Sequence, residues 1–492
     1  MKSRVIKEND LFLMTDENGD MSGADGSVFG LYTRDTRFLS RLEIRINGQT
    51  PVLLSSSADR SCRSVIRLTN PHMEEAGRIE LWRESVEIER RRFIYGGIFY
   101  ETVAMTNFSP KPVSFDFSIR FDSDFADMFV VRGYEKPPGG RKSEPVAERG
   151  KLTLRYVGSD EVVRETRIEW NGGGSADADG TVRLQASLQP KETETFSYRV
   201  VPVVDGLAHQ AHGEAEALAK LEASYREWSD RTTHMASDYP AYDRMYARGV
   251  SDLRALLTDV GHGPFPVAGL PLFAVPFGRD SLIAALQMLS VQPEVARGTL
   301  RTMAAMQGTK EDPWRDEQPG KIMHEIRYGE LANLGAIPFT PYYGTIDATP
   351  LFLLLAAEYF HWTGDRDLIA ELLLPIEKAL DWIDRYGDQD GDGFLEYRRD
   401  ADGGLANQGW KDSGDSIVHA DGEFAQGSIA LAEVQGYVYQ AKTRLAPILS
   451  ELGREDLAVR LTVEAAQLRA RFEHAFWMEE ERFYAIALDG AK

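Results

Sequence analysis

The stretch from Asn407 to Ser416, Asn-Gln-Gly-Trp-Lys-Asp-Ser-Gly-Asp-Ser, has the residue types that acid catalysis on a sugar needs. It places two carboxylates, Asp412 and Asp415, beside Trp410 in a short segment interrupted by glycine. An indole ring offers a stacking face, and apolar surroundings raise the pKa of a carboxyl group toward the working range of a general acid. The alternative is a solvated loop whose aspartates cap the next helix. Considered alone, the stretch makes both aspartates candidates.

The pair Arg279-Asp280 begins a predicted helix after a segment rich in proline and glycine. A guanidinium donates hydrogen bonds and a carboxylate accepts them, so adjacent Arg and Asp side chains can hold vicinal hydroxyls. The alternative is that Asp280 is an acidic residue favoured by the helix dipole, with Arg279 on the surface.

The segment 308–347 is dense in aromatic and hydrogen-bonding residues, which suits a sugar site. Asp347 at its end also has the sequence context of a helix N-cap or first turn. His324 is expected to be a hydrogen-bonding or structural residue, because no second histidine lies at metal-ligand spacing. Glu433 is expected early in a helix that begins at the same mouth. The residue pattern leaves open whether Glu433 contacts a substrate hydroxyl or belongs to a buried ion pair.

Asp388, Asp390 and Asp392 match the first half of a calcium-binding loop, D-x-D-x-D-G. The twelfth position is Arg399, where such a loop has a bidentate glutamate. We therefore interpret the segment as a tight acidic turn, with a structural Ca²⁺ as the alternative. Asp16, Asn18 and Asp20 match more weakly. No required cofactor is predicted, because the sequence has no G-x-G-x-x-G, P-loop or G-x-S-x-G motif.

The composition of the 492-residue chain excludes several classes of partner. The net charge of −21 argues against nucleic acid and anionic membrane surfaces, whose binding relies on clustered Lys and Arg. A neutral or cationic ligand is expected instead. The most apolar run, 351–357, is too short to span a bilayer. Cys62 is the single cysteine, so no intrachain disulfide forms and a cytoplasmic location is expected. These patterns specify no oligomeric state.

The first two hundred residues have the period of β-strands. Apolar residues alternate with polar ones at 113–121, 182–188 and 196–200, and turn residues separate the runs. This arrangement predicts an antiparallel β-sandwich over residues 1–205.

The composition changes near Gly206, after which helical patterns dominate. A linker helix is predicted at 211–226, within a helical linker that spans 206–238. Further helices are predicted in the remaining region, 239–492, at 279–290, 293–307, 348–363, 366–374, 375–386, 421–446 and 455–475. Pro375 is expected at the first position of its helix. The long irregular segments 308–347 and 387–420 are expected to carry function. Helices joined by alternating short and long connections suggest an α/α toroid, with a plain helical bundle as the alternative.

Several runs together resemble the bacterial amylo-α-1,6-glucosidases, which are glycogen-debranching-type glycoside hydrolases. In the β-rich part, the runs are Gly30 to Ser40 and Asp124 to Gly133. In the helical part, they are Pro276 to Ser281, Tyr343 to Phe352, Asp388 to Tyr397, Gly409 to Ser416 and Glu433 to Tyr437. The resemblance covers essentially the whole chain. It implies a β domain followed by the first part of an (α/α)6 barrel.

The resemblance also implies inverting hydrolysis of α-glucosidic bonds, typically the α-1,6 branch stubs of glycogen-like glucans. Asp412 then matches the general acid, with Asp415 as its rival. Arg279 and Asp280 match the pair that holds the non-reducing glucose. The remaining matched residues are expected in the same pocket: Asp347, Trp410, Lys411 and Glu433.

An inverting enzyme needs a second carboxylate to activate water, and the resemblance implies a glutamate late in the barrel. We expect this base beyond residue 492, and the given chain to be a fragment of low activity. The dipeptide Asp489-Gly490 agrees, because it favours a hairpin turn that has no return strand in the sequence. Two alternatives stay open. One is a non-catalytic glucan-binding or assembly protein, and the other is another α-glucosidase or trehalase-like enzyme on the same barrel.

Overall fold

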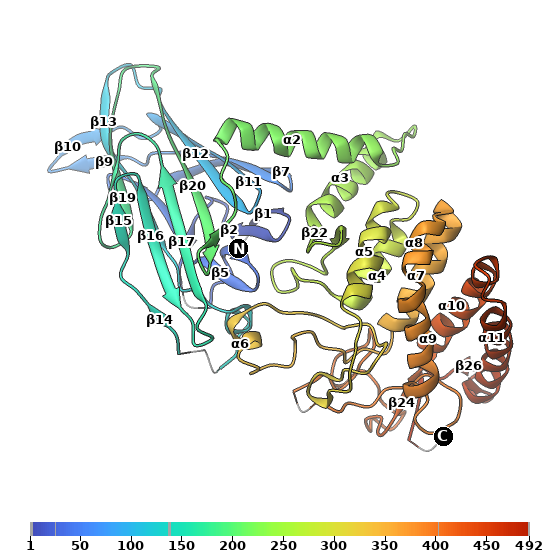
Figure 1. The fold of residues 1–492 in the computed structure, drawn as a ribbon. Helices are drawn as coiled ribbons and strands as arrows, with labels where there is room; N and C mark the ends of the chain where they lie inside the picture. The colour runs from blue at the N-terminus through green and yellow to red at the C-terminus, as the bar shows by residue number, and fades with distance from the viewer. Residues whose placement is uncertain (1–2, 25, 136–138, 402, 491–492) are drawn as a thin grey trace. The chain divides into compact units, whose positions relative to one another are not determined.

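The computed structural model describes residues 3–24, 26–135, 139–401 and 403–490 (Figure 1). The chain divides into two compact units. The N-terminal unit comprises Met1–Leu257, Gly269–Ala274 and Tyr328–Leu334, and the C-terminal unit comprises Thr258–Ala268, Val275–Arg327 and Gly335–Lys492. This division groups residues 206–257 with the β-rich part, whereas the predicted helical domain begins at residue 239.

Two large antiparallel sheets make up most of the N-terminal unit (Figure 1). The first has the order β14-β16-β17-β20-β12-β11-β8-β7, with β15 paired to β16 and β21 to β20. Its strands are β7 (Val52–Arg60), β8 (Arg63–Thr69), β11 (Val86–Tyr95), β12 (Ile98–Asn107), β14 (Arg141–Lys142), β15 (Val146–Glu148), β16 (Lys151–Val157), β17 (Val163–Trp170), β20 (Thr193–Val204) and β21 (Leu207–Ala208).

The second sheet has the order β18-β19-β13-β6-β3. Its strands are β3 (Met21–Ser22), β6 (Arg41–Ile46), β13 (Val113–Asp122), β18 (Ser175–Ala176) and β19 (Thr181–Leu188). A smaller sheet joins β1 (Arg4–Glu8), β2 (Leu11–Thr15), β4 (Gly30–Thr33) and β5 (Thr36–Leu39), and a hairpin pairs β9 (Met73–Glu75) with β10 (Arg78–Leu81). The short helix α1 (Met128–Val131) follows β13.

Strand β13 shows why the alternating pattern predicts a sandwich. Phe115, Phe117 and Ile119 are buried in one large hydrophobic core, whereas Ser114 and Arg120 are exposed. Because successive side chains of a strand point to opposite faces, this alternation buries one face of the sheet and leaves the other to solvent. The predicted antiparallel sandwich is confirmed.

A buried ionic network lies within this sandwich. Arg90 donates from Nε to Oε1 of Glu101 at 2.6 Å and from Nη1 to the carboxylate of Asp20. Arg92 pairs with the other oxygen of Glu101 at 2.9 Å, and the Tyr198 hydroxyl also donates to Glu101. Asp20, which the sequence suggested as a weak calcium ligand, is therefore an ion-pair partner of a buried arginine.

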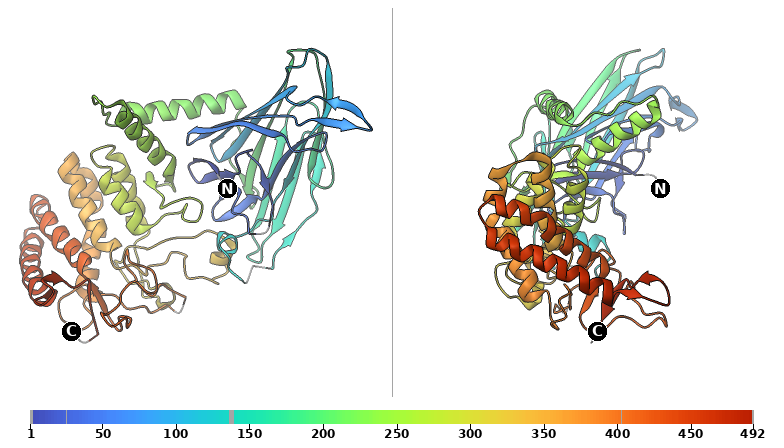
Figure 2. Two further views of the ribbon diagram at one scale, coloured as in Figure 1. Left: turned by 180° about the vertical axis from the view of Figure 1, so that it is seen from behind. Right: turned by 90° about the vertical axis from the view of Figure 1, so that its right-hand side faces the viewer.

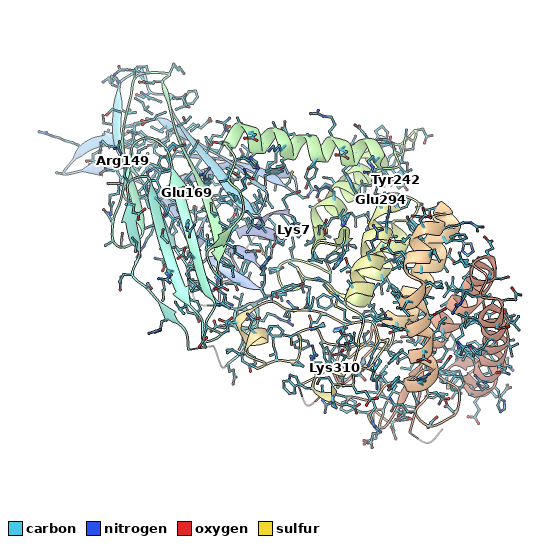
Figure 3. All side chains as sticks on the ribbon, viewed as in Figure 1. Lys7, Arg149, Glu169, Tyr242, Glu294 and Lys310 are labelled. Carbon is cyan, nitrogen blue, oxygen red and sulfur yellow. The ribbon has the colours of Figure 1, made fainter. Side chains whose placement is uncertain are left out.

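Two long helices follow the sheets in the N-terminal unit, α2 (Glu214–Arg231) and α3 (Pro240–Leu256). Lys7 of β1, labelled in Figure 3, donates to the carbonyl oxygens of Ala255 and Leu257, both at 3.0 Å. These carbonyls lie at the carboxyl end of α3, where backbone acceptors lack partners within the helix. The side chain of Lys7 therefore ties α3 to the strand β1.

The C-terminal unit is built on helices whose bounds agree closely with the sequence patterns at most positions. They are α4 (Gly278–Gln287), α5 (Glu294–Ala305), α7 (Ala348–Thr363), α8 (Arg366–Glu371), α9 (Leu373–Tyr386), α10 (Ala432–Glu451) and α11 (Glu455–Ala475). Pro375 is the third residue of α9, whereas the prediction placed it first. Its missing N–H costs nothing at the third position either, because N–H groups of the first helical turn have no acceptor within the helix. The irregular segment 308–347 contains η1 (Pro313–Arg315), and α6 (Glu330–Asn333) belongs to the N-terminal unit.

The predicted helix 421–446 is wrong in its first eleven residues. Gly422 and Gly427 have φ of 91° and 76°, which a right-handed helix does not admit. The strand β24 (Ile429–Leu431) follows, paired with β27 (Ala487–Asp489), and α10 begins only at Ala432. The other short strands of this unit are β22 (Leu257–Asp259), β23 (Pro264–Pro266), β25 (Trp477–Met478) and β26 (Phe483–Tyr484).

The predicted hairpin turn at Asp489-Gly490 is also corrected, because Asp489 lies within β27. The Asp489 carboxylate accepts from the backbone N–H of Gln426 at 2.8 Å, and Asp489 lies opposite Ile429 in the pairing of β27 with β24. Residues 491–492 lie outside the described residues.

The helices of the C-terminal unit pack in pairs, as an α/α toroid requires. α10 and α11 lie side by side, which the right-hand view of Figure 2 shows, and α7 packs against α4, α9 and α10. The multidomain fold class, an antiparallel sandwich followed by helices of the α/α-toroid type, is confirmed. Among the helices of the described chain, none combines the length and the apolar character needed to cross a membrane.

Candidate active site

Three helices of the C-terminal unit begin at one place. Arg279 lies in the first turn of α4, Asp347 immediately precedes α7, and Glu433 lies in the first turn of α10. Contacts between their side chains and the segment 409–416 join these helix starts. The amino ends of helices carry a partial positive charge, which favours carboxylates there. The fold therefore concentrates acidic groups where the predicted site residues gather.

Arg279 is the centre of this cluster. Its Nη1 lies 3.3 Å from Oδ2 of Asp347, and its Nη2 lies 3.1 Å from Oδ2 of Asp412, which is 133 residues away in sequence. Its Nε is 3.9 Å from the carboxylate of the neighbouring Asp280. One guanidinium thus contacts three carboxylates. The alternative of a surface arginine is wrong, because the Arg279 side chain is 11% exposed.

Asp347 is the buried member of the cluster. It occupies the N-cap position of α7, but its side chain caps no backbone N–H. Its carboxylate instead accepts from the Thr345 hydroxyl at 2.6 Å and from Arg279, and the residue is 1% exposed. Burial raises the pKa of Asp347, although Arg279 and Thr345 oppose the increase. Thr345 is a contributor that the sequence did not single out.

Asp412 lies in different surroundings from those predicted. Its side chain is 44% exposed and contacts a guanidinium instead of lying in an apolar pocket. Trp410 is 56% exposed, and the ammonium group of Lys411 lies 4.8 Å from the centre of its ring system. Asp415 is exposed, and of the two aspartates Asp412 is the one that contacts Arg279. The geometry therefore joins Asp412, and not Asp415, to the cluster.

Lys411 and Glu433 form the second ion pair of the site, with Nζ 2.8 Å from Oε1. Both side chains are 20% exposed. Both alternatives for Glu433 are therefore compatible with its position: it is an ion-pair partner, and it remains partly accessible to a ligand. Both site cations, Arg279 and Lys411, are engaged by carboxylates.

Asp316, which the sequence analysis overlooked, holds the two long segments together. Its Oδ1 accepts from the backbone N–H groups of Asp400 and Ala401 at 3.0 and 2.9 Å. Its Oδ2 accepts from the Tyr342 hydroxyl at 2.8 Å and from Nε2 of Gln408 at 3.2 Å. Because Gln408 closely precedes Trp410, Asp316 links the segment 308–347 to the segment that carries Asp412. Asp316 is distinguished locally by its backbone. It directly follows the short helix η1, which begins at Pro313, and it has a left-handed φ of 51°.

His324 supports the start of α4 as a structural residue, as predicted. Its carbonyl oxygen accepts from the Gly278 N–H at 2.7 Å, and its ring packs edge-on against Phe277 and Tyr342. Its Nδ1 is buried and has no hydrogen-bond partner within the described ranges. Burial, together with the positive charges of Arg279, Arg327 and Lys321, lowers the pKa of His324 from 6.5 to about 3. The imidazole is therefore neutral at physiological pH.

Asp388, Asp390 and Asp392 gather as the calcium-loop pattern predicts, with one oxygen from each within 4.8 Å of the others. Asp388 accepts from the backbone N–H groups of Gly391 and Gly393, and Asp392 from that of Phe394. These bonds are typical of a tight acidic turn. Three carboxylates suit Ca²⁺, but the fit is partial, because Arg399 occupies the position of the bidentate ligand. Calcium binding stays the alternative interpretation of this turn.

Comparisons with known proteins bear on both units. Residues 6–199 match the family model of the N-terminal domain of (some) glycogen debranching enzymes. A search of curated proteins found no match. Among solved structures, a protein from the human microbiome assigned as a kojibiose phosphorylase superposes with a TM-score of 0.60 at 9% identity, covering 98% of this chain and 69% of that one.

A bacterial glucoamylase in complex with acarbose superposes with a TM-score of 0.53 at 11% identity, covering 97% of this chain and 67% of that one. At these identities the likeness shows the fold. The family model bears on residues 6–199 of the N-terminal unit, and the two structural likenesses extend over nearly the whole chain.

Proposed function

We propose that this protein, whose N-terminal domain is of the glycogen-debranching-enzyme type, is a cytoplasmic glycoside hydrolase that removes glucose from α-1,6 branch stubs of glycogen-like glucans. The observation that carries the proposal is the contact of one guanidinium, Arg279, with carboxylates from two distant segments. The fold is shared with a glucoamylase solved with acarbose, which adds support.

In this proposal, Arg279 and Asp280 hold the hydroxyls of the terminal, non-reducing glucose. Arg279 donates and Asp280 accepts, and Asp280 is sufficiently exposed, at 40%, to meet a ligand. Asp347 fixes the orientation of the guanidinium from its buried side. Trp410, the most exposed of these residues, offers its ring as a stacking surface for the next sugar.

Asp412 is proposed as the general acid. It protonates the glycosidic oxygen as the bond to the leaving sugar breaks, so it must carry a proton and be released from Arg279. Its exposure makes this exchange feasible, whereas Asp347 stays buried. Glucose hydroxyls then replace Asp412 on Nη2 of Arg279. An inverting reaction also needs a carboxylate about 6.5–9.5 Å from the acid to activate water. The proposal leaves that base unassigned.

A second candidate reaction is phosphorolysis, because one structural neighbour is assigned as a phosphorylase. Phosphate would need free cationic or hydroxyl groups beside the reacting carbon. Both site cations are paired with carboxylates, at 3.1–3.3 Å for Arg279 and 2.8 Å for Lys411. The acidic cluster therefore favours water as the acceptor.

The test measures glucose release from a branched dextrin by the full-length wild-type protein and its Asp412→Asn and Asp415→Asn variants, with and without inorganic phosphate. We expect Asp412→Asn to lose activity by about 10²–10⁴-fold while still binding maltooligosaccharide, because the amide cannot donate an acidic proton. Asp415→Asn is the matched control. Full activity of Asp412→Asn refutes its role, and glucose 1-phosphate as the main product refutes hydrolysis.

Maltooligosaccharide binding by the wild-type chain, with no turnover by either this chain or a longer form of the protein, would favour a non-catalytic glucan-binding protein. Faster cleavage of trehalose or of α-1,4 ends would favour another α-glucosidase specificity.

A further inference from the structure

One face of α10 beside the site has no role in the proposed reaction. Gly436 and Tyr437 follow Glu433 by three and four residues, so all three share a helix face. Glu433 is joined to Lys411, the neighbour of Asp412. Gly436 and Tyr437 therefore extend the site along α10.

Gly436 leaves this face open. A Cβ built at this position would meet no atom within 4 Å, and the residue is exposed. Its φ is not among the positive values that favour glycine in this chain. Glycine destabilises a helix interior relative to alanine. Neither packing nor backbone conformation therefore requires glycine here, and its effect is to leave the backbone of α10 uncovered next to Glu433.

Tyr437 borders the same space. It is half-buried, and its hydroxyl has no hydrogen-bond partner among residues 3–24, 26–135, 139–401 and 403–490. Burial raises the pKa of Tyr437, and the charges of Asp347 and Glu433 add to the increase while Arg279 opposes it. Tyr437 lies one helical turn after Glu433, which pairs with Lys411, so the phenol lies beside the predicted sugar pocket.

We propose that Tyr437 binds the terminal glucose through its hydroxyl and ring, and that Gly436 provides the space in which this sugar lies against α10. This inference rests on the proposed function, because it names two further residues of the same glucose pocket. A phenol pairs well with a sugar, since its ring covers C–H groups and its hydroxyl both donates and accepts.

The first test compares Tyr437→Phe and Tyr437→Ala with Tyr439→Phe, by calorimetry with maltose and by steady-state kinetics on branched dextrin. Tyr439 is the matched control because it lies on the same helix and lines the outer groove between α10 and α11. We expect Tyr437→Phe to weaken maltose binding about 2–13-fold, the value of a hydrogen bond to an uncharged group. KM should rise more than kcat falls. Tyr437→Ala should bind more weakly still, and Tyr439→Phe as wild type.

The second test concerns volume. Gly436→Leu should reduce maltose binding more than 10-fold, whereas Gly436→Ala should reduce it less. Gly249 of α3 is the matched control, because it is also helical and exposed, with no atom within 4 Å of a built Cβ. Gly249→Leu should bind maltose as the wild type does. Melting temperatures of all six variants in the two tests verify folding.

The outcomes separate this inference from the proposed function. If the wild-type chain binds and hydrolyses glucans but Tyr437→Phe and Gly436→Leu behave as wild type, the roles of Gly436 and Tyr437 are refuted and the function stands. If the wild-type chain neither binds maltose nor cleaves dextrin, both fail. A fall in melting temperature with unchanged binding would assign Tyr437 a purely structural role and also overturn the inference.

Discussion

Arg279 and Asp347 form an ion pair that joins the start of α4 to the start of α7, with Nη1 3.3 Å from Oδ2. Asp347 is 1% exposed, so this side of the guanidinium is fixed, whereas Asp412 on its other side is accessible. Arg279 therefore has one permanent contact, with Asp347, and one contact, with Asp412, that a ligand is able to replace.

We predict that Arg279→Lys weakens maltooligosaccharide binding at least 10-fold. A lysine keeps the charge but loses the planar fork that contacts Asp347 and Asp412 together. Calorimetry measures the loss. Arg301→Lys is the control, because Arg301 pairs with Glu371 between α5 and α8 and should affect binding little. Unchanged binding by Arg279→Lys would contradict the central role of this guanidinium.

Asp316 should be among the residues of the C-terminal unit most sensitive to substitution. Asp316→Ala removes the acceptor of four hydrogen bonds, and we expect a loss of about 3–5 kcal/mol in the free energy of unfolding. Asp316→Asn should cost about 1–3 kcal/mol, because its NH₂ group would face donors. Urea denaturation measures both, with Asp312→Asn as a more exposed control. A change below about 0.5 kcal/mol for Asp316→Ala would refute the link between the two segments.

His324 should make stability depend on pH. Its pKa is about 3 in the folded chain and 6.5 in the unfolded chain, so below pH 6.5 the unfolded state binds a proton that the native state does not. The stability is complete above pH 6.5 and decreases toward pH 3, by at most about 1.4 kcal/mol per pH unit.

The measurement is the free energy of unfolding of wild type and His324→Gln between pH 7 and 4. The variant should show a shallower decrease, because the carboxylates titrate in both proteins and cancel in the difference. His419→Gln, which alters an exposed histidine, should keep the wild-type slope. Equal slopes for wild type and His324→Gln would show that the buried imidazole is not responsible.

Glu101 should be essential to the sandwich. Glu101→Gln leaves the buried guanidinium groups of Arg90 and Arg92 without their shared carboxylate, and we expect a loss of about 3–5 kcal/mol in unfolding free energy. Glu169→Gln is the matched control in the same sheet (Glu169 is labelled in Figure 3), because Glu169 forms a partly exposed pair with Arg199 and should cost less than about 1 kcal/mol. Similar losses for both variants would contradict this ranking.

Local patterns predicted the elements well where one face of an element is buried. The alternation at 113–121 predicted strand β13, and the apolar spacing at 348–363 and 455–475 predicted α7 and α11 with their observed bounds. The prediction of a helix at 421–431 was wrong. Composition favours a helix there, but two glycines with positive φ and the pairing of β24 with β27 prevent one.

By itself, the sequence determined the two-part fold, the starts of most helices and the residue types of the candidate site, because periodicity and composition are local properties. The tertiary structure alone decided which carboxylates meet. Asp412 joins Arg279 across 133 residues, whereas Asp415, three residues later, does not. The same packing left Asp412 accessible and buried Asp347 and Asp316. Such contacts depend on how helix starts and long segments converge in space, and no local pattern encodes that convergence.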